Sequence, residues 1–156
     1  MYEIEFPFRA SQRVRFRSGE LIEEWAARYP QLFDARDLEI TRKQPNYHFF
    51  EWLAAVLIYE ATGFLSLIEK YETPSHVRKA QIFSTTVPHD VYDYVMKNRA
   101  GVPDLFVYSP DQSQWYFCEV KGAADKLREH QSERIAELSR ISGGKVCLLK
   151  LKEIPF

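Results

Sequence analysis

Three ionisable residues in the second half of the chain carry its strongest chemical signal. Asp104 directly precedes the apolar run at residues 105–108, and Glu119 and Lys121 follow the apolar run at residues 115–118. Burying an isolated ion in such surroundings costs on the order of several kcal/mol. The pattern is therefore typical of charges that share a partner. A divalent metal ion held by the two carboxylates, beside the lysine, fits best.

The two apolar runs predict a β-hairpin that brings these residues together. The segment between them, 109–114, is rich in turn-forming residues. Pro103 cannot donate a ladder hydrogen bond and so marks the start of the first strand. Glu119 and Lys121 are two residues apart, so their side chains lie on one face of the second strand. Antiparallel pairing then places Asp104 close to both.

Asp104, Glu119 and Lys121 suit metal-assisted hydrolysis of phosphodiester bonds. Carboxylate oxygens are ligands that Mg²⁺ and Mn²⁺ prefer, and such an ion polarises a phosphate and lowers the pKa of a bound water. Lys121 would orient or help deprotonate the attacking water, or neutralise charge developing on the phosphate. A lone Glu-x-Lys triplet is more often a surface ion pair. The acid at the opposite end of the hairpin and the flanking glycines favour the metal site.

The remaining patterns predict an α/β fold in which helices cover a sheet. Helices are expected over 20–27, from Asn46 to about residue 71 with Gly63 as a kink or break, over 90–98, and over 126–142 with Asp125 as its cap; a last strand is expected over 145–151. Residues 81–83 fit a strand or a helical turn equally well. The first 45 residues are predicted to form an extension, a strand plus a short helix, that packs on a core of residues 46–156.

Composition indicates one ordinary globular domain. The 156 residues are 46% hydrophobic and 28% charged, with a formal net charge of -1, which excludes a generally basic protein but not a local basic patch. Cys118 and Cys147 lie in apolar runs, so we expect them to be buried and reduced, without a zinc site. The acidic start lacks a signal-peptide pattern, and Glu51 and Glu60 interrupt the longest apolar stretch. We therefore expect a cytoplasmic protein that does not enter a membrane.

The motif residues have a recognisable order. Gly101-x-Pro103-Asp104, then Glu119-Val120-Lys121-Gly122, then Gln131 resembles the VRR-NUC family of the PD-(D/E)xK nuclease superfamily. This family includes the nuclease domain of the Fanconi-associated nuclease and stand-alone phage and bacterial proteins. The resemblance is strong from Gly101 to about residue 150. It implies a restriction-endonuclease-like fold with a central mixed sheet, a Mg²⁺ or Mn²⁺ cofactor, and cleavage of structured DNA such as flaps, junctions or ends.

The resemblance also implies further site residues. Gln131 lies within the apolar stripe of the helix predicted over 126–142, where it is either a core amide bonded to backbone or a site residue, and the family pattern favours the site. The family supplies another acid from its first helix, for which Glu51 and Glu60 compete. We choose Glu51, because it lies in the most apolar section of that helix. The backbone carbonyl of Val120 completes the expected metal ligands.

Several basic residues are candidates for contact with DNA phosphates. Arg13, Arg15 and Arg17 alternate with apolar residues, which predicts a strand with one basic face. Lys97 and Arg99 directly precede the motif. Taken alone, each of these sets of basic residues is more often part of a solvated surface than of a DNA-binding site.

The sequence therefore predicts a divalent-metal-dependent nuclease that acts on DNA. The alternative is a module with the same fold that binds nucleic acid or assembles with a partner but lacks the chemistry. The complete set of two acids and a lysine favours the enzyme. A homodimer is compatible with either function, because small stand-alone relatives tend to be symmetric dimers.

Overall fold

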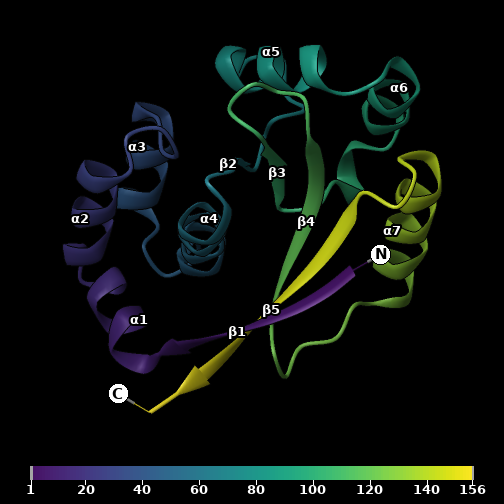
Figure 1. Cartoon of the computed structure of the whole chain (residues 1–156). Coiled ribbons are helices and arrows are strands. Elements are labelled where there is room, and N and C mark those ends of the chain that lie inside the picture. The colour runs from purple at the N-terminus through teal and green to yellow at the C-terminus, as the bar shows by residue number, and fades with distance from the viewer. Residues whose placement is uncertain (1, 156) are drawn as a thin grey trace.

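In a computed structural model that describes residues 2–155, the chain forms a five-stranded mixed sheet with helices on both faces (Figure 1). The elements are β1 (Tyr2–Arg9), α1 (Ala10–Arg17), α2 (Glu20–Arg28), α3 (Ala35–Lys43), α4 (Phe49–Thr62), β2 (Leu65–Ile68), α5 (Val77–Thr86), α6 (His89–Lys97), the 3₁₀ turn η1 (Arg99–Gly101), β3 (Leu105–Tyr108), β4 (Trp115–Gly122), α7 (Glu129–Ile141) and β5 (Val146–Ile154). The strand order is β1-β5-β4-β3-β2. The predicted α/β class with a central mixed sheet is confirmed.

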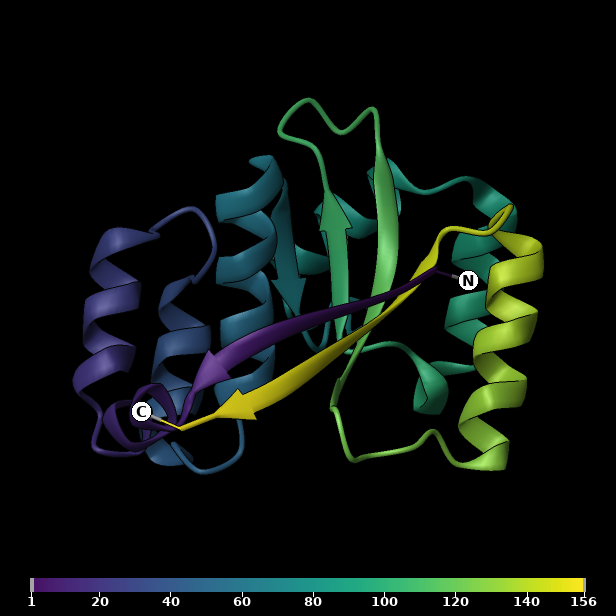
Figure 2. The ribbon, with the colours of Figure 1, turned by 60° about the horizontal axis from the view of Figure 1, so that its bottom comes forward.

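The sheet has a parallel half and an antiparallel half. β5 pairs in parallel with both β1 and β4, whereas β3 pairs antiparallel with β4 and β2. Helices α1–α4 lie on one side of the sheet and α5–α7 on the other (Figure 2). Both faces of the central strands are therefore covered, which explains why β3 is apolar at every position.

The predicted hairpin forms as expected. Leu105 pairs with Cys118 and Tyr108 with Trp115, and the loop closes where the N–H of Ser109 donates to the carbonyl of Gln114 at 2.9 Å. Cys118 faces a second buried free thiol, because β4 and β5 pair it with Cys147. The helix predicted over 90–98 is confirmed as α6, and residues 81–83, left undecided by sequence, lie within α5.

The strand predicted around Arg13, Arg15 and Arg17 is wrong. These residues form α1, and the strand lies just before it as β1, which pairs with β5 at the other end of the chain. Phe16 is fully buried while Val14 is 64% exposed, so the alternation of basic and apolar residues does not mark two strand faces. A parallel partner so far away in sequence leaves no local signal.

The long helix predicted from Asn46 to about residue 71 is also wrong in extent. α4 ends at Thr62 because Gly63 adopts a left-handed conformation with φ of 77° and caps the helix. The apolar residues that follow form β2 at the sheet edge and pair with β3. β2 thus carries the chain from the end of α4 to the start of β3, where the motif lies.

The helix predicted over 126–142 begins late. Asp125 accepts a hydrogen bond from the N–H of Gly122 at 3.2 Å, so it closes a turn after β4 instead of capping a helix. α7 begins at Glu129. Gln131 therefore lies in the first turn of α7, at the helix end nearest the motif, and not in its middle.

Residues 2–45 supply β1 and α1–α3, which is more structure than the strand and short helix expected for this extension. Two ion pairs join α3 and its cap to α5: Asp34 with Arg78 at 3.0 Å, and the buried Asp37 with the buried Lys79 at 2.5 Å. A boundary at residue 45 stays a prediction. Within residues 2–155, no helix combines the length and the apolar character that a membrane crossing demands.

Candidate active site

Asp104 and Glu119 meet at the end of the β3–β4 hairpin. Extending the observed register by one residue beyond the Leu105–Cys118 pair sets the two acids opposite each other. The backbone N–H of Asp104 donates to Oε1 of Glu119 at 3.3 Å, and the N–H of Val120 donates to Oδ2 of Asp104 at 2.9 Å. Each carboxylate is thereby held by the backbone of the opposite strand.

The pair is electrostatically costly without a cation. Glu119 is only 7% exposed. Burial, and next the carboxylate of Asp104, raises the pKa of Glu119 to about 9, while Lys121 acts in the opposite direction. Like charges directly opposite in a sheet repel each other. Two closely spaced carboxyl groups offer oxygen ligands to a divalent cation, and the cation would favour their ionised forms.

The Val120 carbonyl points toward the same place. The N–H and C=O of one strand residue face the same side of the strand. Because the Val120 N–H bonds Asp104, its carbonyl also faces the Asp104 side, away from β5. Its role as a metal ligand stays a prediction.

A cavity of about 350 Å³ opens in front of Asp104 and Glu119. Its lining combines the two acids with four basic side chains and one amide: Asp104, Glu119, Lys121, Arg128, His130, Gln131 and Arg134, with Ala100, Gly101, Val102 and Ile135. Lys121 and Gln131 thus share one hollow with the acids, as the sequence predicted. An excess of positive groups around two carboxylates suits a phosphate held beside a metal ion.

Gln131 is half-buried, caps α7 and faces the cavity. Its Oε1 accepts a hydrogen bond from the backbone N–H of Arg128 at 3.1 Å, which is a capping contact at the start of α7. The same side chain lines the cavity. A catalytic role for Gln131 stays a prediction.

Arg134 is a site candidate that the sequence analysis missed. It lines the cavity one turn after Gln131, and its Nη1 atom is buried without a hydrogen-bond partner in the part of the chain that the structure describes. The spacing of three residues from Gln131 places both on one helix face. That spacing was readable from the sequence, but the direction of the face was not, because the start of α7 was misplaced.

Glu51 lies near the motif, and Glu60 does not. Burial, followed by the carboxylates of Asp104 and Glu69, raises the pKa of Glu51 to about 8. Glu60 instead accepts a hydrogen bond from the hydroxyl of Tyr29. The choice of Glu51 over Glu60 thus has a geometric basis, although its role in catalysis stays a prediction.

Glu69 and His48 are further neighbours. The backbone N–H of Glu69 donates to the carbonyl of Asp104 at 3.0 Å, so the residue after β2 adjoins the start of β3. Sequence analysis missed Glu69 because it lay inside the overlong helix. The side chain of His48 is 11% exposed, and its Nδ1 lies 3.9 Å from Oε1 of Glu69.

The predicted DNA-binding arginines separate onto two faces of α1. Arg13 and Arg17, four residues apart, line a hollow of about 230 Å³ together with Tyr47 and Glu51. Arg15 lies on the opposite face, where Glu20 and Glu24 bind its guanidinium. The structure therefore argues against Arg15 as a phosphate contact.

Lys97 and Arg99 are exposed and precede Ala100, which lines the cavity in front of Asp104 and Glu119. Their contact with DNA stays a prediction. A larger cavity, of about 440 Å³, lies at the opposite end of β4. It is lined mainly by aromatic and apolar residues and contains no carboxylate, so it lacks the groups for this chemistry.

A family model matches the part of the chain that contains the motif. The model of the family described as "VRR-NUC domain" matches residues 66–151, which is more than half of the chain. A solved structure, "Crystal structure of paFAN1 bound to 2nt 5'flap DNA with gap", is similar with a TM-score of 0.35 and 16% identity, over 91% of this chain and 22% of that chain. This chain spans about a fifth of that protein's length. The search of curated proteins gives no match.

Proposed function

Because the chain belongs to the VRR-NUC domain family, we propose that it is a nuclease that hydrolyses phosphodiester bonds in DNA with a divalent metal ion. The observation that carries this proposal is the facing pair of Asp104 and Glu119, joined through backbone hydrogen bonds at the mouth of a basic cavity. A surface ion pair would not need two opposed acids, of which one is 7% exposed.

The metal ion would be held by Asp104, Glu119 and the Val120 carbonyl, with Glu51 close to Asp104. Mg²⁺ or Mn²⁺ suits this oxygen-donor set. When bound, the ion would polarise the phosphate and lower the pKa of a water. Its positive charge would also offset the burial and the repulsion by Asp104 that together raise the pKa of Glu119.

The other cavity residues would act on the phosphate and the water. Lys121 projects from the same strand face as Glu119, so its ammonium is placed to orient the attacking water or to neutralise the phosphate. Arg134 lines the cavity, and its guanidinium, whose Nη1 has no partner among the described residues, would bond a phosphate oxygen. Gln131 would orient the water or the substrate from the first turn of α7.

We propose structured DNA, such as a flap, a junction or an end, as the substrate, and this choice rests on the family resemblance. The two arginines beside Glu51 and the basic residues at the cavity rim support a path for DNA on this side of the molecule. Their positive charge would contact phosphates without selecting a base sequence.

The direct test is cleavage of a panel of end-labelled DNAs with Mg²⁺ or Mn²⁺. The panel contains single strands, duplexes, flaps, gapped flaps and four-way junctions. Lys121→Ala and Asp104→Asn should abolish cleavage. Lys152→Ala is the matched control, because Lys152 is an exposed lysine on the neighbouring strand β5 outside the cavity.

Full activity in Lys121→Ala or Asp104→Asn would contradict the proposal. Absence of cleavage on every DNA, together with absence of Mn²⁺ binding by calorimetry, would favour the alternative of a binding or assembly module. Cleavage that persists with excess chelator would contradict the proposed requirement for a metal ion.

A further inference from the structure

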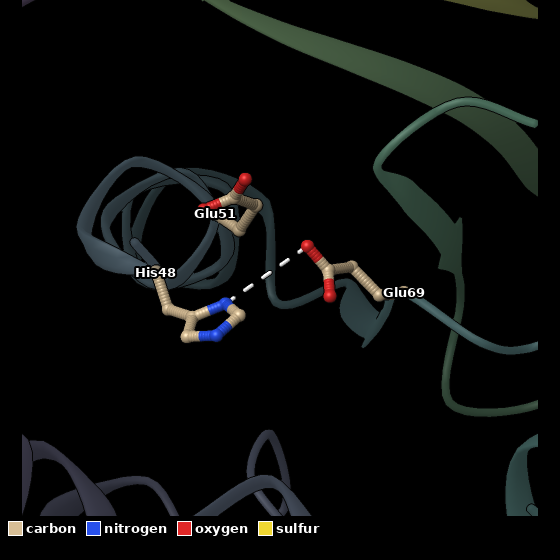
Figure 3. Close-up of side chains that lie close together, drawn as sticks. All are labelled: His48, Glu51 and Glu69. Carbon is tan, nitrogen blue, oxygen red and sulfur yellow. Dashed lines mark ion pairs between the residues drawn. The ribbon is translucent and has the colours of Figure 1, made fainter. Parts of the chain in front are cut away.

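His48, Glu51 and Glu69 form a second cluster of possible metal ligands beside the catalytic pair (Figure 3). Each offers one donor atom, and the three atoms lie within 4.8 Å of one another. His48 and Glu51 belong to the start of α4, and Glu69 follows β2. The three side chains therefore converge from two elements that are adjacent only in the folded chain.

His48 is held in an orientation that suits a metal ligand. Its ring is 11% exposed; Nε2 lies 3.3 Å from Oε1 of Gln44, and Nδ1 lies 3.9 Å from Oε1 of Glu69. A hydrogen bond to one ring nitrogen fixes the tautomer and leaves the other nitrogen free to bind a cation. Gln44 supplies this bond, so Nδ1 is the free nitrogen.

Glu69 is held by an unusual backbone. Its φ is 49°, a left-handed conformation that costs free energy in a residue other than glycine. Two contacts fix it: the N–H of Glu69 donates to the Asp104 carbonyl at 3.0 Å, and Lys79 Nζ donates to the Glu69 carbonyl at 3.3 Å. The strained turn presents the side chain toward His48 and leaves it partly open to solvent, which gives an ion a route of entry.

Glu51 supplies a buried oxygen that lacks a partner. Its Oε2 is inaccessible to solvent and accepts no hydrogen bond from any residue within 2–155. A buried carboxylate oxygen without a partner is destabilising by several kcal/mol or shifts the group to its neutral form.

We propose that His48, Glu51 and Glu69 bind a divalent transition-metal ion, such as Mn²⁺ or Zn²⁺, at a position distinct from the cation between Asp104 and Glu119. One imidazole with two carboxylates favours these ions over Mg²⁺ and Ca²⁺. Ligand atoms about 2.1 Å from one ion in a tetrahedral arrangement lie about 3.4 Å apart, so binding requires side-chain movements on the order of 1 Å.

Glu51 links this position to the catalytic one. Glu51 lies near Asp104 and has two carboxylate oxygens, one for each position. In this respect alone the inference rests on the proposed function. The His48 site is otherwise independent, since His48 and Glu69 do not line the catalytic cavity.

Binding of Zn²⁺ to the unmodified protein is the first test. With ¹⁵N-labelled histidine, we expect Zn²⁺ to shift the Nδ1 resonance of His48 at concentrations that leave His89 unchanged. His89 is the matched control, because it is an exposed histidine with a carboxylate partner, Asp93, at 3.2 Å. An unshifted His48, or equal shifts at both residues, would overturn the proposal.

Counting bound Mn²⁺ by calorimetry and by electron paramagnetic resonance is the second test. The wild-type protein should bind two ions, and His48→Ala should bind one of them at least about tenfold more weakly. Glu69→Gln should do the same and provides a second variant if His48→Ala fails to fold. His89→Ala should bind two ions as the wild type does.

The two proposals fail differently. If His48→Ala and Glu69→Gln bind both ions with wild-type affinity, the His48 site is overturned while the nuclease proposal stands. If Asp104→Asn retains two ions and the wild type cuts no DNA, the nuclease proposal fails while loss of one ion in His48→Ala still supports this site.

Discussion

Gly101 and Arg134 approach each other so closely that a side chain at position 101 would displace the arginine. A Cβ atom on Gly101 would lie 2.2 Å from Cδ and 2.8 Å from Nη1 of Arg134. The glycine in the Gly101-x-Pro103-Asp104 motif therefore keeps open the space through which Arg134 reaches the cavity wall.

Gly101→Ala should thus reproduce the defect of Arg134→Ala. The arginine side chain can move aside, so we expect a small change in melting temperature. Loss of a charged hydrogen bond to phosphate should lower kcat/KM for DNA cleavage by at least about tenfold. Steady-state kinetics on the best substrate measures this, with Lys152→Ala as a control outside the cavity. Wild-type kinetics in Gly101→Ala would contradict a role for Arg134.

Glu119→Gln should separate stability from activity. Glu119 has its pKa raised to about 9, so the uncharged amide resembles its state near neutral pH without metal. In excess chelator, we expect the melting temperature of Glu119→Gln to be equal to or higher than that of the wild type. With metal present, its cleavage rate should fall by at least about a hundredfold. Calorimetric unfolding and a cleavage assay give the two readouts.

The control for Glu119→Gln is Asp93→Asn, which changes an acid of α6 whose side chain is 47% exposed. This variant should retain cleavage. If Glu119→Gln cleaves DNA normally, Glu119 is not a metal ligand. If it instead melts much earlier in chelator, Glu119 is ionised and stabilising in the metal-free protein.

Asp34→Ala should destabilise the protein in a pH-dependent manner. Although burial opposes it, the N–H of Asp37 and the charges of Lys79 and Arg78 lower the pKa of Asp34 below 3.8. A carboxyl group whose pKa is lower in the folded than in the unfolded protein stabilises the fold at pH values above its unfolded pKa. This contribution is lost as the pH falls through its folded pKa. Asp34→Ala should therefore cost about 1 kcal/mol near neutral pH and less in acid.

Urea unfolding of wild type and Asp34→Ala at about pH 7 and at about pH 3 measures this difference. Asp34→Asn is the informative partner, because it keeps a capping oxygen but lacks the charge. A loss of stability that is equal at both pH values would show that the Asp34 charge contributes nothing.

Arg17→Ala should weaken binding of DNA, and Arg15→Ala should not. Arg17 is exposed beside Glu51 and Tyr47, whereas Glu20 and Glu24 already bind Arg15. Fluorescence anisotropy at several salt concentrations should show a salt slope reduced by about 1 for Arg17→Ala. An unchanged salt slope for Arg17→Ala would mean that the α1 face toward Glu51 does not contact DNA.

The sequence by itself determined the centre of this protein. Apolar runs around a short turn specify a hairpin, and the hairpin register sets Asp104 opposite Glu119 with Lys121 on the same face. These relationships are local, since they depend on a short loop and on the two-residue repeat of a strand. For the same reason α6 and the last strand were predictable.

Only the tertiary structure decided which distant residues surround that centre. β1 pairs with β5 across the length of the chain, and Glu69 meets Asp104 because β2 pairs with β3. The space at Gly101 is explained only by Arg134 on α7. Pairing between distant segments depends on how whole faces pack, and this leaves little trace in the local pattern. The hairpin thus follows from the sequence, whereas the grouping of His48, Glu51 and Glu69 and the position of Arg134 follow from the fold.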